Sequence, residues 1–209
     1  MKLLLSIFIF YCAGLCAQST DNDVISINQS FENYKKLLAE KNGKEAAKLV
    51  DKNTINYYES IVLMAKRASF EHVKTLNFMD KFMVLSVRHY MTKDEILKSN
   101  GTQLFEYAVS KGWIDANAIK SLTLGKVNVQ NNLASVQLLS NGNVTPINLN
   151  FSREVGKWKV DLTSLFPSAN TQLKSNAPEK IKQEEEQILQ MLEKSSGQKP
   201  SQNIWKPVM

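Results

Sequence analysis

The period of the hydrophobic repeat changes near residue 120, and this change constrains the fold more than any other feature of the chain. Before that point, apolar residues recur every three or four positions, which is typical of amphipathic helices. After it, apolar and polar residues alternate, which is typical of strands with one buried face. Helices followed by strands predict an α+β fold. We expect N-terminal helices packed on a curved, cone-like antiparallel sheet of four strands, followed by a C-terminal helix and a tail.

The helical half carries capping signals that predict where individual helices begin. Thr54 and Ser69 each precede a run of helical periodicity, which predicts two N-caps. The run that follows Ser69 extends to Tyr90 and predicts one long helix. Thr92 is followed three residues later by Glu95, which predicts a capping box at the start of a further short helix.

The strand half carries signals for turns and for one irregularity. Asn141–Gly142 predicts a tight hairpin turn, and Val155–Lys157 predicts another. The alternation slips at Gly125–Lys126, which predicts a β-bulge. The strands are therefore expected to form an antiparallel meander. Alternation in the last strand turns these residues toward the core: Trp158, Val160 and Leu162.

The first seventeen residues have the three parts of a secretory signal peptide. Lys2 supplies a positive start, residues 3–11 form an apolar run, and small residues precede a cleavage point after Ala17. The apolar run is short for a membrane anchor, and a polar sequence follows it at once. We therefore expect export to the periplasm or the medium, with no stable membrane span after cleavage.

Both cysteines of the chain lie inside this predicted signal peptide. Cleavage after Ala17 removes Cys12 and Cys16, so the mature protein would have no disulfide and no thiol nucleophile. Lipid anchoring at Cys16 is disfavoured, because a bacterial lipoprotein signal prefers a small residue where this chain has Leu15.

The remainder of the chain divides where its composition changes. Residues 18–23 are a polar lead-in, and residues 24–166 carry the α+β pattern. Residues 167–177 are rich in Ser, Asn and Thr, which predicts a linker. Residues 178–194 have a narrow apolar stripe on a charged background and predict a C-terminal helix. Residues 195–209 are polar and predict a flexible tail.

Composition and charge exclude some classes of function. Apolar residues make up 43% and charged residues 22% of the chain, which is typical of a globular domain and not of a disordered one. The formal net charge is +6 at pH 7, but the lysines are spread along the sequence. Without a dense basic block interleaved with aromatic residues, nucleic-acid binding is not expected.

Three parts of the chain resemble the nuclear-transport-factor-2-like superfamily, whose fold is also called cystatin-like or ketosteroid-isomerase-like. The first is residues 31–38 (FENYKKLL), the second is residues 46–51 with 54–58, and the third is the final strand region, residues 156–162. The resemblance covers residues 24–166. It implies a sheet curled around the first long helix, with an apolar pocket at the mouth. Because this fold hosts enzymes, binding domains and dimerisation modules, it does not imply one function.

The resemblance also directs attention to acids and hydrogen-bond donors. Relatives that isomerise or dehydrate a substrate use an inward-facing Asp or His together with a Tyr. Tyr57 and Tyr58 are the candidate hydrogen-bond donors. Asp80 is the best candidate acid, because apolar residues flank it. The alternative for Asp80 is an ordinary position on a solvated helix face. The only histidines, His72 and His89, cannot form a three-histidine site. We expect no metal ion and no cofactor.

An excess of Met and Phe in the middle of the helical half indicates a second kind of site. Met79, Phe82 and Met83 are the candidate pocket residues, since such side chains form adaptable apolar walls. Ordinary core packing is the alternative explanation. The leading hypothesis is an exported, non-enzymatic domain that binds a small apolar ligand or a protein partner.

Two alternative functions stay open at this point. One is a small hydro-lyase or isomerase that acts in the cone pocket. The other is a secreted structural or assembly accessory whose C-terminal helix and Trp205 bind a partner. A homodimer is compatible with each of these hypotheses.

Overall fold

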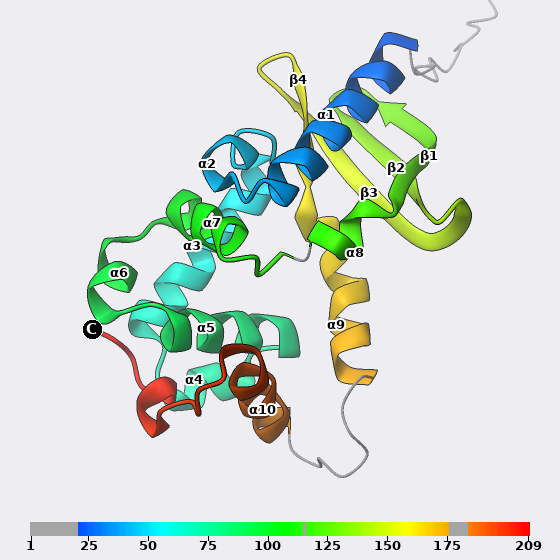
Figure 1. Ribbon diagram of the computed structural model, residues 1–209. Coiled ribbons are helices and arrows are strands. Elements are labelled where there is room, and N and C mark those ends of the chain that lie inside the picture. Colours follow the sequence, from blue (N-terminus) through cyan, green and yellow to red (C-terminus); the bar gives the residue numbers. More distant parts are fainter. Residues whose placement is uncertain (1–20, 115, 176–183) are drawn as a thin grey trace, which may run out of the picture.

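The α+β order predicted from the hydrophobic repeat is confirmed in a computed structural model, which describes residues 21–114, 116–175 and 184–209. The predicted signal peptide therefore lies outside the described residues. None of the helices in the described ranges has the length and hydropathy needed to cross a bilayer. Figure 1 shows the sheet with α1 (Asp21–Ala39) at one end of the molecule and most of the other helices at the opposite end.

The helices and strands follow one another with short connections. The helices between α1 and the sheet are α2 (Gly43–Ala46), α3 (Lys52–Arg67), α4 (Phe70–Thr75), α5 (Phe78–Tyr90), α6 (Lys93–Lys98), α7 (Gly101–Ser110) and α8 (Ala116–Lys120). The strands are β1 (Leu122–Gln130), β2 (Leu133–Ser140), β3 (Asn143–Glu154) and β4 (Lys157–Asp161). The short 3-10 helix η1 (Leu162–Leu165), α9 (Phe166–Ser175), α10 (Glu184–Ser196) and the 3-10 helix η2 (Gln202–Trp205) come last.

The sheet is an antiparallel meander in the order β1-β2-β3-β4, as the turn signals predict. Asn141 and Gly142 have φ values of 50° and 78°, and a type I′ hairpin turn requires positive φ at both positions. The register of β1 against β2 shifts between Leu124 and Val127, which confirms the bulge at Gly125–Lys126. The inward-facing residues of the last strand region are buried, as expected: Trp158, Val160 and Leu162.

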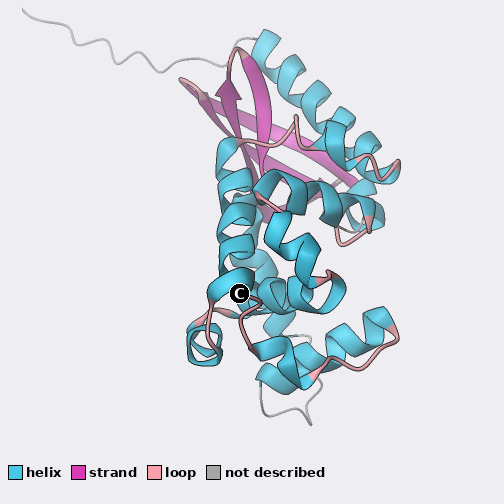
Figure 2. Cartoon of the chain, turned by 90° about the vertical axis from the view of Figure 1, so that its left-hand side faces the viewer, coloured by secondary structure: helices cyan, strands magenta, loops and turns pink. Residues whose placement is uncertain are grey.

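Helix α1 lies against the sheet (Figure 2). Large buried side chains fill the space between them. Phe31 and Tyr34 of α1 are almost wholly buried, and the Phe31 ring meets the edge of Phe151 at a centroid distance of 6.5 Å. The Ser30 hydroxyl donates a hydrogen bond of 2.8 Å to the Trp158 carbonyl of β4. This region is therefore packed core, and the hollows described below lie elsewhere.

The predicted cap at Ser69 is confirmed, since its side chain accepts from the His72 backbone N–H at the start of α4. One predicted helix start and one predicted helix length are wrong, and local hydrogen bonds explain both. The third helix is capped by Asp51, whose side chain accepts from the Thr54 backbone N–H at 2.9 Å, so Thr54 lies inside the first turn. The long helix expected between Ser69 and Tyr90 is divided into α4 and α5. Asn77 divides it by accepting from the Asp80 backbone N–H at 3.0 Å and capping α5.

The C-terminal part of the chain differs from the prediction. Residues 166–175, expected to be mostly linker, form α9, because Phe166 packs on Tyr57 at 4.4 Å and Asn170 accepts from the Met79 backbone N–H at 3.1 Å. The predicted helix at 178–194 is described from residue 184 onward, as α10. The tail expected to be flexible contains η2, whose Ile204 is buried, and its last residues bond to the end of α3.

Candidate functional site

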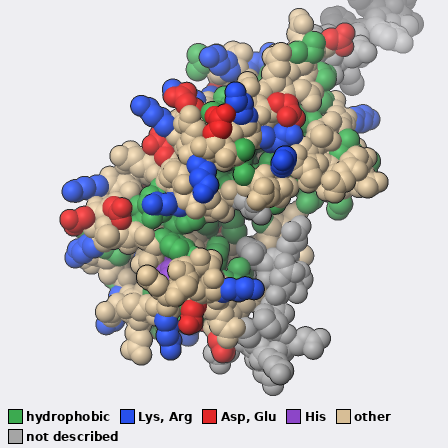
Figure 3. Space-filling model, in the orientation of Figure 1, with side chains coloured by type: hydrophobic (Ala, Val, Ile, Leu, Met, Phe, Trp, Pro, Cys, Tyr) green, Lys and Arg blue, Asp and Glu red, His purple; other side chains and the backbone are tan. Residues whose placement is uncertain are grey.

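A hollow of about 920 Å³ opens among the helices at the end of the molecule away from the sheet. It lies between α5, α7, the segment 111–114 that follows α7, and α10, and we call it the helical hollow. Figure 3 shows hydrophobic side chains gathered in a recess on this face. Its main apolar and aromatic lining residues are Met79, Phe82, Met83, Tyr90, Tyr107 and Trp113.

The three predicted pocket residues all line this hollow. Met79, Phe82 and Met83 have the i, i+3, i+4 spacing that places side chains on one face of a helix, here the inner face of α5. Met83 is buried, whereas Met79 and Phe82 are half-buried. The hollow lies among helices, however, and not at the mouth of a cone formed by α1 and the sheet. That these side chains bind a ligand remains a prediction.

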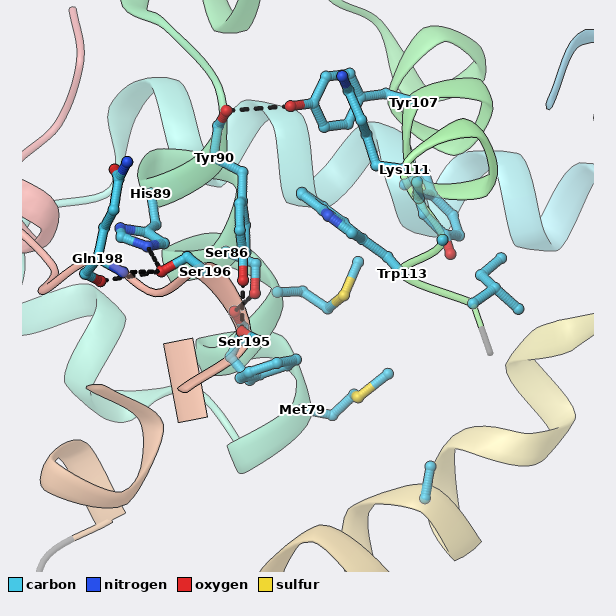
Figure 4. Close-up of a pocket in the computed structure, with 17 residues that line it drawn as sticks. Met79, Ser86, His89, Tyr90, Tyr107, Lys111, Trp113, Ser195, Ser196 and Gln198 are labelled. Carbon is cyan, nitrogen blue, oxygen red and sulfur yellow. Dashed lines mark hydrogen bonds between the residues drawn. The ribbon is translucent and has the colours of Figure 1, made fainter. Parts of the chain in front are cut away.

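Three aromatic side chains form a rigid part of the wall (Figure 4). The Trp113 ring lies 5.3 Å from the Tyr90 ring and 5.4 Å from the Tyr107 ring, measured between centroids. The Tyr107 hydroxyl donates to the Tyr90 carbonyl at 3.0 Å, which ties α7 to the end of α5. Tilted and edge-to-face rings of this kind hold one another in place. They present a fixed aromatic surface to the hollow.

Helix α10 forms the opposite wall and is attached by polar contacts. The Tyr90 and Ser195 hydroxyls share a hydrogen bond of 2.5 Å, and His89 Nε2 shares one of 2.8 Å with the Ser196 hydroxyl. Burial lowers the pKa of His89, so this ring is neutral at neutral pH. Figure 4 shows these bonds joining the end of α10 to α5.

The His89–Ser196 pair has the composition of a nucleophile and its base, but its geometry is that of a helix end. The Ser196 Oγ also contacts the carbonyl oxygens of Leu192 at 2.8 Å and Gln198 at 2.9 Å. Within the described ranges, no carboxylate hydrogen-bonds to His89 and orients it, as the triad arrangement requires. The pair fastens α10 to α5.

The structure does not bring the three predicted catalytic residues together around one cavity. Tyr58 lines the helical hollow and is only 6% exposed, and its ring packs edge-on against Phe105 at a centroid distance of 5.2 Å. Burial raises the pKa of Tyr58, which keeps its hydroxyl protonated.

Tyr57 and Asp80 bond to each other and do not line the hollow. The Tyr57 hydroxyl donates to Asp80 Oδ1 at 2.9 Å, and the Asn77 amide donates to Asp80 Oδ2 at 2.6 Å. Burial, with the adjacent Asp80 carboxylate, raises the pKa of Tyr57. This pair links α3 to the first turn of α5. Tyr58 and Asp80 are therefore not arranged as donor and base around one cavity.

Sequence reasoning missed the aromatic wall and the contacts of α10. Tyr90, Tyr107 and Trp113 carry no shared motif, and the residues that meet across the hollow lie as far as 107 positions apart. Among the described residues, no cluster of three or more His, Cys, Asp or Glu side chains is suited to hold a metal ion.

Comparison with known proteins finds no matching family model, no matching curated protein and no matching solved structure. The relation to the nuclear-transport-factor-2-like superfamily therefore remains a prediction from the residues quoted above.

Proposed function

We propose that this protein is a non-enzymatic binding module that holds a small apolar ligand in the helical hollow. The observation that carries the proposal is the lining of the hollow, in which two Met side chains and three mutually packed aromatic rings surround about 920 Å³. That volume is in the range of small-molecule sites, which are mostly apolar with few polar groups. Met side chains adapt to a ligand's shape, whereas the rings supply a rigid surface for a flat group.

The polar groups around the hollow favour binding over catalysis. His89, Ser195 and Ser196 already bond to one another's helices, so they hold the wall together. Tyr58, whose hydroxyl burial keeps protonated, also lines the hollow. His89 is a base that lines the hollow, but its Nε2 is engaged with the Ser196 hydroxyl, so proton transfer to a ligand would first have to break that contact.

Fluorescence titration with N-phenyl-1-naphthylamine tests this proposal. This neutral aromatic probe brightens when it leaves water for an apolar site. We expect saturable binding at one site per chain. Trp113→Ala should weaken it about fivefold, because one aromatic contact contributes about 1 kcal/mol. Trp205→Ala is the matched control, since Trp205 packs on Phe70 at 5.6 Å and does not line the hollow.

Two results would contradict the proposal. One is the absence of saturable binding by the folded protein. The other is equal weakening by Trp113→Ala and Trp205→Ala, which would place the probe elsewhere. Circular dichroism of each variant separates loss of the site from loss of the fold.

We propose further that the module acts after export, as a member of the nuclear-transport-factor-2-like superfamily. Export is supported by the signal-peptide pattern of residues 1–17, and the family by the segments that carry the resemblance. N-terminal sequencing of the protein recovered from outside the cytoplasm should begin at Gln18. Recovery in the cytoplasm with Met1 intact would contradict export.

A further inference from the structure

A second hollow, of about 650 Å³, adjoins the helical hollow. It lies between α1, α8 and the segment 111–114, and we call it the lysine hollow. Lys111, Gly112 and Ile114 line both hollows, so one short segment separates an aromatic space from a second space. A single ligand that crosses this segment would contact both.

The lysine hollow is strongly cationic. Of its described lining residues, Glu32 is the one acid, and five are lysines: Lys35, Lys36, Lys41, Lys111 and Lys120. Lys35 bonds to Glu32 at 2.8 Å, and Lys36 lies 3.9 Å from Glu40. Asp115, which belongs to the same part of the chain, lies outside the described residues.

Three of these lysines have no ion-pair partner within 21–114, 116–175 and 184–209: Lys41, Lys111 and Lys120. Lys111 belongs to the segment shared by the two hollows, and Lys41 lies close to that segment. The end of the Lys41 side chain is 3.9 Å from the position that a Cβ atom would take on Gly112. The Lys111 ammonium lies 5.5 Å from the centre of the Tyr107 ring, which lines the helical hollow. Unpaired cations gathered in this way favour a bound anion.

We propose that the ligand of this protein is an amphiphilic organic anion. Its apolar body would occupy the helical hollow, and its carboxylate, sulfate or sulfonate group would lie over Lys41 and Lys111. This inference rests on the proposed function and adds the charge of the ligand to it. Aromatic lining and unpaired lysines on the two sides of one segment match the two ends of such a molecule.

Two probes that differ by one sulfonate test the inference. We would titrate the protein with neutral N-phenyl-1-naphthylamine and with anionic 8-anilino-1-naphthalenesulfonate. The anion should bind about tenfold more tightly, as expected for contact with two partly exposed lysines. Raising the salt concentration to half-molar should reduce this preference, because ions screen exposed charges.

Lysine variants locate the effect. Lys41→Gln combined with Lys111→Gln should abolish the preference for the anion, so that the two probes bind with about the same affinity. The control combines Lys126→Gln with Lys157→Gln, which removes the same charge from exposed positions that line neither hollow. Its preference for the anion should stay within twofold of the original. Circular dichroism would verify that each variant is folded, since the anionic probe also binds partly unfolded chains.

Each other outcome has a definite meaning. Equal binding of the two probes would overturn the inference about charge and leave the proposed function standing. Binding of neither probe would overturn both. A preference that the two pairs of substitutions reduce equally would overturn the assignment to Lys41 and Lys111.

Discussion

Lys81 provides the sharpest test of how α10 is held against α5. Its side chain is 4% exposed, and its ammonium lies 2.8 Å from Glu184 and 3.9 Å from Glu185, the first residues of α10. The two carboxylates are 32% and 30% exposed. The cation is therefore buried, whereas water reaches both acids. Removing the acids and removing the cation should have different consequences.

Replacing both acids, Glu184→Gln with Glu185→Gln, leaves an ammonium buried without a charged partner. Breaking a buried pair from one side costs about 3–5 kcal/mol. Because water reaches the acids, we expect a cost at or just below the lower limit of this range, about 2–3 kcal/mol. Lys81→Met removes the buried charge together with its desolvation penalty, and should change the free energy of unfolding by less than about 1 kcal/mol.

Urea unfolding followed by far-ultraviolet circular dichroism measures these differences. The decisive variant adds Lys81→Met to the two Glu→Gln changes, and should recover more than about 1 kcal/mol of the lost stability. The reasoning would be refuted if Lys81→Met alone destabilised the protein as much as the double acid variant. Failure of the triple variant to recover any stability would refute it equally.

Four further substitutions have predicted effects on stability, each measured by urea unfolding. Arg88→Lys should cost about 3 kcal/mol, because the half-buried guanidinium donates to four backbone carbonyls at 2.7 to 3.3 Å; a loss under about 1 kcal/mol would contradict this. Gly43→Ala should cost at least about 2 kcal/mol, because its Cβ would lie 2.2 Å from the Glu106 carbonyl oxygen; unchanged stability would show that the helices separate freely. Tyr34→Phe should add about 1 kcal/mol, because the buried Tyr34 hydroxyl has no partner among the described residues, and a loss would indicate a missed bond. Burial lowers the pKa of His89 below 6.5, so the unfolded chain binds more protons than the folded chain just below that pH. The free energy of unfolding should therefore fall as the pH drops from 7 toward 5. His89→Gln should flatten this decline, and an unchanged pH profile would exclude His89 as its source.

Local signals in the sequence were sufficient for most of the fold. Alternation and turn residues predict the meander, its bulge and its tight turns, since each depends on residues close together in the chain. The break between α4 and α5 also has a local signal, because Asn77 followed by Asp80 is a capping pattern inside an otherwise helical repeat. The helical spacing of the apolar residues continues across Asn77, and it therefore predicted one unbroken helix.

The candidate site could be predicted only in part. Met79, Phe82 and Met83 share one helix, so their spacing alone groups them. The opposite walls come from α7 and α10, and no local pattern predicts that distant helices meet there. The lysine cluster could not be predicted from the sequence for the same reason. Lysines that are spread along the sequence come together in the lysine hollow, because α1, α8 and the end of α7 converge there.

Binding in the helical hollow is the central claim, and methionine methyl spectra test it most directly. Protein labelled with [methyl-13C]methionine would be titrated with N-phenyl-1-naphthylamine, with resonances assigned by single Met→Leu variants. The account predicts that the methyl signals of Met79 and Met83 shift with saturation, while that of exposed Met209 stays in place. Saturable binding that leaves Met79 and Met83 unmoved would contradict it.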